Sequence, residues 1–291
     1  MLWIGAGVTV LATYMLGELN NLYSLLRVRS RLVSALYLLL MLAYPALHVW
    51  RLEMLTSLCL LAAFFLLFAS YQQARPEGPV FHAFLFATVG GMLFPPALVF
   101  PAVFYFCMLF QLRSLTLRSF VAGLLGVATP FFLYSSYAIL THRLPSAFDF
   151  LLSWLHFERP DYTLLTLPAL VTFAVVFLFV LLALIHFFRE RYNDKIRTRM
   201  LLYVIVSLEV VILCGLVLLP SAFNGLFLLF LLNSAPIIAH YYALARGRFF
   251  NFWFNLCFLV LLALAVFNYL CLYGPLQQLL ELRPAAGLQL W

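Results

Sequence analysis

Long apolar runs, following one another with short polar breaks, limit what this chain can fold into. They cover residues 2–17, 32–50, 54–71, 80–94, 96–111, 117–141, 164–188, 200–219, 223–245 and 249–273. A run of about 20 apolar residues is long enough to cross the hydrocarbon core of a bilayer as a helix. Because no repeat or soluble domain interrupts the runs, the sequence predicts one all-α domain over residues 1–291, a polytopic transmembrane bundle of nine or ten segments.

Composition argues against a water-soluble protein. Hydrophobic residues make up 66% of the chain and charged residues only 9%, so there is too little polar surface to cover a soluble globule. The formal net charge of +7 suggests nucleic acid as a partner. The basic residues, however, lie at the ends of apolar runs, where Lys and Arg anchor helices. We therefore expect the lipid bilayer to be the main partner, and no nucleic acid.

The basic residues also predict an orientation. If loop 189–199, the most basic of all, is cytoplasmic, the alternation of the runs places 13 of the 17 Lys and Arg residues on the cytoplasmic side. Cytoplasmic loops of inner-membrane proteins carry such an excess. The sequence therefore predicts a bacterial inner-membrane protein with loop 142–162 in the periplasm. The same alternation puts Met1 outside, so we expect either a further helix before this sequence or an unusual insertion of residues 2–17.

Residues 90–101, GGMLFPPALVFP, break the apolar pattern with glycine and proline. The runs on either side are short, about 22 and 24 Å as helices, and proline suits the first turn of a helix better than its interior. We predict a hairpin of two short helices with an external tip. Irregular backbone inside a membrane requires surrounding protein or a water-filled cavity, so a cavity and a simple tight turn are the two alternatives. The residues that would shape the cavity are Gly90, Gly91, Pro95, Pro96 and Pro101.

Acids and histidines gather on the predicted external face. Loop 142–162 has an apolar centre, residues 146–157, for which we predict an interfacial or re-entrant helix. Carboxylates and imidazoles beside it would suit general acid/base catalysis or a divalent metal that holds a phosphate. The alternative is that polar residues simply collect in external loops. The catalytic candidates are Glu53, Asp149, His156, Glu158 and Asp161, and because no metal-site spacing accompanies them we expect no metal and no cofactor.

Glu209 lies near the middle of an apolar run, about 14 Å along the predicted helix. An acid at that depth is costly unless it is protonated or paired, so it is a functional-site hypothesis by default. Asn233 and Ser234 lie at a matching depth in the next, antiparallel run. We predict that Glu209 forms a hydrogen bond with one of them. Such a pair would serve a proton relay or an ion site, or it would hold two helices together.

Residues 18–45 and 81–137 carry a set of recognisable motifs. They are an RxR turn before a helix that ends at Pro45, the hairpin FATVGGMLFPP, and RSLTLR leading into a helix with Gly126 and Pro130. In these features the chain resembles an uncharacterised family of Bacteroidota integral membrane proteins.

The order of the segments also resembles, more distantly, the transmembrane core of C-type glycosyltransferases (GT-C), which use polyprenyl-phosphate-linked sugars. The resemblance equates residues 2–17 with the second helix of that core. The loop that carries the catalytic carboxylate in those enzymes would precede it, and no residue of this chain matches that acid. We therefore expect a non-catalytic or orphan GT-C-like component of cell-envelope assembly that binds lipid-linked sugar or other membrane proteins. The alternative is an active membrane glycosyltransferase or transporter that handles a polyprenyl-phosphate-linked sugar.

Overall fold

The computed structural model describes residues 2–26, 30–142, 160–244 and 248–273. These residues form α-helices joined by short turns, with no strand among them, so the predicted all-α bundle is confirmed. Seven helical segments in this part of the chain are long and apolar enough to cross a membrane, which makes this a multi-pass membrane protein. The helices are α1 (Leu2–Tyr23), α2 (Leu32–Ala43), α3 (Leu52–Ala69), α4 (Glu77–Leu93), α5 (Phe100–Cys107), α6 (Leu117–Leu140), α8 (Leu167–Glu190), α9 (Ile196–Leu218), α10 (Phe223–Leu244) and α11 (Arg248–Tyr273).

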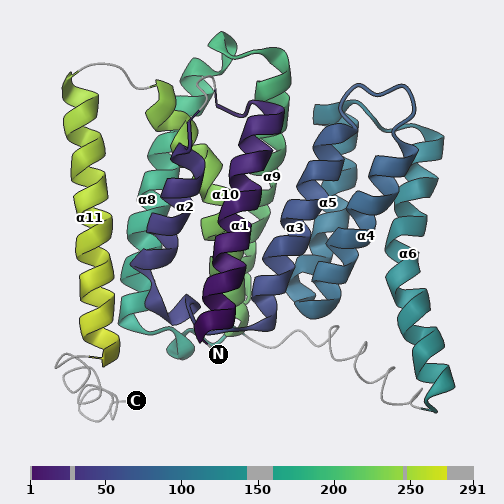
Figure 1. The fold of residues 1–291 in the computed structure, drawn as a ribbon, viewed down its shortest axis with the longest axis horizontal. Helices are drawn as coiled ribbons and strands as arrows, with labels where there is room; N and C mark the ends of the chain where they lie inside the picture. Colours follow the sequence, from purple (N-terminus) through teal and green to yellow (C-terminus); the bar gives the residue numbers. More distant parts are fainter. Residues whose placement is uncertain (1, 27–29, 143–159, 245–247, 274–291) are drawn as a thin grey trace.

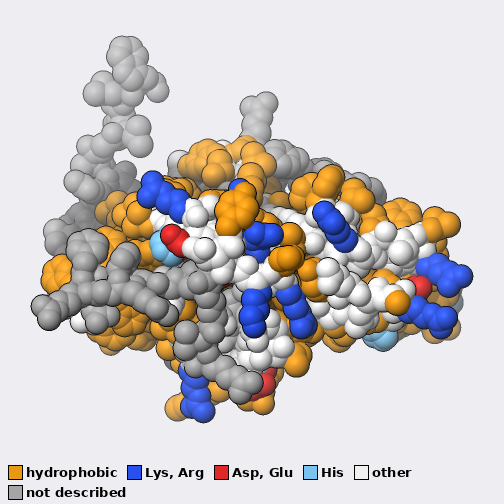
Figure 2. Space-filling model, turned by 90° about the horizontal axis from the view of Figure 1, so that it is seen from above, with side chains coloured by type: hydrophobic (Ala, Val, Ile, Leu, Met, Phe, Trp, Pro, Cys, Tyr) orange, Lys and Arg blue, Asp and Glu red, His pale blue; other side chains and the backbone are white. Residues whose placement is uncertain are grey.

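The helices lie side by side and alternate in direction along the chain (Figure 1). The turns after α1, α3, α5 and α8 therefore meet at one end of the bundle, which we call the basic end. Figure 2 looks down on it and shows Lys and Arg side chains spread across the surface. The described basic residues there are Arg31, Arg75, Arg113, Arg118, Arg189, Arg191, Lys195, Arg197 and Arg199. Arg51, just before α3, lies at the opposite end.

Helix α10 forms the centre of the bundle. It packs against α2, α8 and α9, with a further contact to α3. Its side chains are buried on every side, and Phe227, Phe230 and Leu231 have no exposed surface. A helix that is apolar all round is typical of such a core position. Polar residues on α10 therefore face protein and not lipid.

Small residues bring α4 close to its neighbours α3 and α6. A Cβ on Gly90 would lie 3.2 Å from the Cβ of Cys59 on α3. A Cβ on Gly126 of α6 would overlap the backbone carbonyl of Phe81 on α4. Glycine at these positions lets the backbones approach, which is a common way to pack helices in membranes.

Two of the helix boundaries that the sequence predicts are wrong. Helix α1 does not end at Gly17 but continues to Tyr23. Its polar last turns are held because Asn20 turns inward, donates to the Ser30 carbonyl (3.3 Å) and accepts from the Leu26 N–H (3.0 Å). Helix α2 ends at Ala43, short of the apolar run to residue 50 and close to the Pro45 end that the motif indicates, because the residue before a proline is driven out of the helical conformation.

The early end of α2 leaves its last carbonyl groups without the usual helical partners; the Tyr44 N–H caps the Met41 carbonyl at 3.3 Å, and side chains supply further hydrogen bonds. His48 Nε2 donates to the Met41 carbonyl at 2.9 Å. The Asn268 amide, on α11, donates to the Ala43 carbonyl and to the Thr172 hydroxyl of α8, both at 2.7 Å. A carbonyl left without a hydrogen bond inside a membrane costs on the order of several kcal/mol. These bonds therefore make a half-length helix tolerable.

The predicted hairpin is present, but its second arm is longer than expected. Helix α4 is its first arm, and the second arm runs from Pro95 to Leu112 as a 3₁₀ turn (Pro95–Val99), α5 and a π-helical turn (Met108–Leu112). This arm is long and apolar enough to cross a membrane. Its prolines lie in first turns, where the missing N–H leaves no bond unmade, so they do not shorten it.

Candidate functional site

Glu209 lies completely buried on α9, facing α10. The Asn233 amide donates to Glu209 Oε2 at 2.7 Å, and Ser234 Oγ lies 2.5 Å from Glu209 Oε1. The pairing expected from the sequence is thus present with both partners. Whether it serves more than helix packing stays a prediction.

The hydrogen atoms available around Glu209 favour its neutral form. The Ser234 hydroxyl carries one proton but lies within reach of two acceptors, Glu209 Oε1 and the Phe230 carbonyl at 2.7 Å. The Asn233 amide uses its two protons on Glu209 and on the Ile205 carbonyl, the latter at 2.7 Å. If Glu209 carries a proton, it donates to Ser234, and all four contacts are made at once. Burial without a cationic partner favours the same state.

The catalytic candidates fall into two groups. Asp149, His156 and Glu158, with the predicted interfacial helix at 146–157, lie outside the described residues. Glu53 lies in the first turn of α3 and packs against Gly225 of α10. A Cβ added to Gly225 would lie only 2.7 Å from Glu53 Cγ. The ring of Phe94, at the hairpin tip, lies equally close to that point. Glu53 is therefore beside the tip.

Asp161 serves a local purpose. Its Oδ1 accepts the Thr163 hydroxyl at 2.6 Å and the Thr163 backbone N–H at 3.0 Å, which caps a short 3₁₀ turn. These hydrogen bonds lower the pKa of the Asp161 carboxyl. Because a general acid must hold a proton near neutral pH, this environment suits a charged capping group better than a proton donor.

The glycines and prolines of the hairpin pack its tip. A Cβ on Gly91 would lie 2.5 Å from the side chain of Leu98, so only glycine lets the arms close this tightly. The Thr56 hydroxyl of α3 donates to the Gly90 carbonyl at 3.0 Å, and Pro101 is buried. A cavity shaped by Gly90, Gly91, Pro95, Pro96 and Pro101 stays a prediction.

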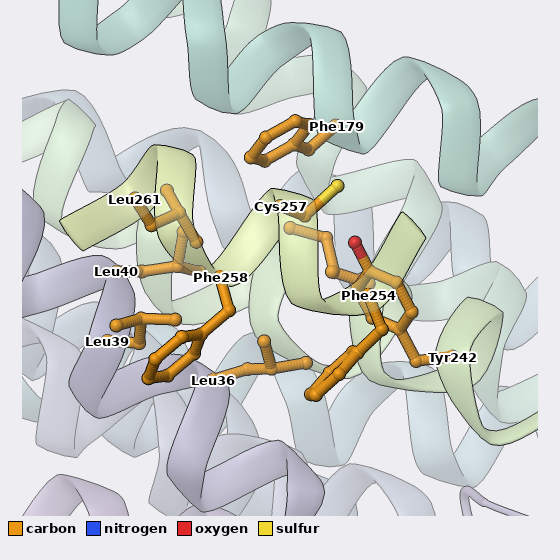
Figure 3. Close-up of a pocket in the computed structure, with 10 residues that line it drawn as sticks. Leu36, Leu39, Leu40, Phe179, Tyr242, Phe254, Cys257, Phe258 and Leu261 are labelled. Atoms are coloured by element: carbon orange, nitrogen blue, oxygen red, sulfur yellow. The ribbon is translucent and has the colours of Figure 1, made fainter. Parts of the chain in front are cut away.

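One hollow lies among α2, α8, α10 and α11. Figure 3 shows apolar side chains around it, with the Tyr242 hydroxyl turned toward Cys257. Its volume is about 10 Å³. A single water needs roughly that much space and also needs polar partners. This hollow is a packing defect and not a ligand site.

A second hollow lies between α1 and α2 near the basic end. It measures about 430 Å³ and is lined by Val10, Thr13, Tyr14, Gly17, Glu18, Asn21, Arg31, Ser34 and Leu38. The sequence does not predict this hollow, because the first apolar run ends at Gly17, before Glu18 and Asn21. The signal was nevertheless there, since Val10, Tyr14 and Glu18 repeat at the spacing of one helical face.

The sequence analysis also missed a buried pair at the basic end. His240 Nε2 of α10 lies 3.1 Å from Asp194 Oδ2, and both side chains are almost fully buried. Asp194 precedes α9, so the pair ties the basic turn to the core helix. No sequence spacing links the two residues, which are joined only by the packing of α9 and α10.

Within the described ranges, no three His, Cys, Asp or Glu residues lie together in a way that could hold a metal ion. Comparison with known proteins found no match, whether among family models, curated proteins or solved structures.

Proposed function

We propose that this protein is a non-catalytic, GT-C-like component of cell-envelope assembly in the bacterial inner membrane. The GT-C-like and cell-envelope parts of the proposal rest on the order of the segments, and the observation that favours a non-catalytic role is the environment of Glu209. Of the described acids, Glu209 is enclosed by α9 and α10 without exposed surface, and its hydrogen bonds hold these two helices together. A relay or an ion pathway needs access to water, which this position lacks.

The proposed orientation puts the basic end in the cytoplasm. Its support is the grouping of Lys and Arg at one end of the bundle, with Arg51 at the other. Loop 189–199 is then cytoplasmic and loop 142–162 periplasmic.

Cysteine labelling tests this orientation. In a background without the native cysteines, we expect Ser221→Cys, at the end opposite the basic end, to react with a membrane-impermeant maleimide in intact spheroplasts. Asn193→Cys, which is exposed at the basic end, should react only after the membrane is permeabilised. The reverse pattern would overturn the orientation, and each variant serves as the control of the other.

One observation favours a second function, an active transferase or transporter for a polyprenyl-phosphate-linked sugar. Glu53 lies beside Phe94 at the hairpin tip, where an external cavity would bring a carboxylate to a lipid-linked substrate. A transferase of this kind would depend on the external acids for general acid/base work.

Acid-to-amide variants separate the two functions. We expect deletion of the gene to lower envelope-glycan output in the native host, and Glu53→Gln, Glu158→Gln and Asp161→Asn to restore it to the wild-type level. The control is Glu77→Gln, at the basic end. A loss of about 100-fold or more in output from one external variant, with its protein level and melting temperature unchanged, would establish catalysis instead. No change on deletion would contradict the envelope role.

A further inference from the structure

The groove between α1 and α2 has the size and the position of a lipid site. Its volume of about 430 Å³ falls within the range of roughly 300 to 1,000 Å³ typical of small-molecule sites. Val10 and Tyr14 on one wall and Leu38 on the other are exposed at its edge, and their relative exposures are 64%, 65% and 45%. In a membrane these side chains face acyl chains and not water.

Polarity changes along the groove in step with depth. Glu18 lies about 7.5 Å from the last residue of α1, and Arg31 directly precedes α2, so both are near the membrane surface at the basic end. Val10 and Leu38 lie about 10 to 12 Å deeper along their helices. The groove is therefore polar where lipid headgroups lie and apolar where their chains begin.

The two charged side chains of the groove do not pair with each other. Glu18 and Arg31 are both exposed and both line the groove, yet in the described part of the chain they form no ion pair with one another. The Ser34 hydroxyl, between them and the deeper end, already donates to the Thr13 carbonyl at 3.1 Å. The two charged groups, with the exposed Asn21 amide beside them, are thus left to bind a ligand.

A ligand with both charges fits this pair better than a ligand with one. An anionic headgroup would be attracted to Arg31 but repelled by Glu18, and a cation would meet the opposite pattern. Arg31 also stands at the N-terminus of α2, where the helix dipole adds positive potential. A phosphate at Arg31 with an ammonium group at Glu18 satisfies both ends.

We propose that this groove binds an aminophospholipid, with its phosphate at Arg31, its primary ammonium at Glu18 and its acyl chains along Val10, Tyr14 and Leu38. Gly17 keeps the site narrow, because a Cβ there would lie 2.7 Å from Ser34 Oγ and would push the walls apart. This binding site goes beyond the proposed function and does not depend on it.

The test is lipid binding to the full-length protein in detergent, measured by native mass spectrometry. The probes are phosphatidylethanolamine, phosphatidylcholine, phosphatidylglycerol and a polyprenyl phosphate. We expect phosphatidylethanolamine to bind about tenfold more tightly than phosphatidylcholine, whose methylated ammonium has no proton to donate to Glu18. Glu18→Gln should remove this preference, and Arg31→Gln should weaken all three phospholipids.

Matched controls at the same end are Glu77→Gln and Arg75→Gln, which lie outside the groove and should bind like the wild type. Lipid-free melting temperatures show whether each variant is folded. Equal binding of the three phospholipids, tighter binding of phosphatidylglycerol or of the polyprenyl phosphate, or an unchanged preference in folded Glu18→Gln would each overturn the proposal.

Discussion

Alanine in place of Glu209 will lower the melting temperature of the protein in detergent by roughly 5 °C, the shift expected for about 3 kcal/mol in a chain of this size. The side chain has no exposed surface, so its removal leaves a cavity. It also removes one hydrogen-bond partner each from Asn233 and Ser234.

Glutamine at the same position is the matched variant. Its amide donates to Ser234 and its carbonyl accepts from Asn233, which reproduces the contacts of a neutral glutamate. We therefore expect Glu209→Gln to melt within about 2 °C of the wild type, since the volume and the bonds are kept. If glutamine costs as much as alanine, Glu209 is held as a carboxylate and the hydrogen-bond assignment is wrong.

Alanine in place of Gly126 is expected to cost about 2 to 3 kcal/mol, or roughly 3 to 5 °C in melting temperature. The new Cβ would overlap the Phe81 carbonyl and lie 3.0 Å from the Phe84 Cβ. Backbone cannot give way as a flexible side chain can, so α4 and α6 must separate. Alanine favours a helix over glycine by about 1 kcal/mol, and the loss must therefore come from packing.

Gly7→Ala on α1 is the control, because a Cβ there meets nothing within 4 Å. It should be neutral or stabilise slightly. Equal melting temperatures for the two variants would show that the close approach of α4 and α6 does not contribute to stability.

The sequence predicts helix type and order well because hydrophobic runs are set by the bilayer. The break at Pro45 was harder to place. Proline marked it, but the run stays apolar to Trp50, and the hydrogen bonds from His48 and Asn268 explain why α2 can stop inside the bundle. The pairing of Glu209 could be predicted because both partners lie on consecutive antiparallel helices at one depth.

Residues that meet only through tertiary packing were beyond such an argument. Asp194 lies in the turn before α9 and His240 on α10, and the groove of Glu18 and Arg31 depends on how far α1 extends past Gly17. A polar residue at a helix end, such as Asn20, looks like part of a loop in the sequence. Its hydrogen bonds to the backbone of Ser30 and Leu26 show that it belongs to the helix, and these bonds are visible only in the structure.

The Asn268 hydrogen bond also bears on how the protein is made. Its acceptor, the Ala43 carbonyl, precedes it by 225 residues. Helix α2 leaves the ribosome early. Asn268, which donates to the Ala43 carbonyl at the end of α2, is made later, with α11. At about 5 to 20 residues per second, the nascent chain holds an unsatisfied helix end in the membrane for some 10 to 45 seconds. During this time the Ala43 carbonyl needs a hydrogen-bond donor from outside α11, and water or the insertion machinery can supply one.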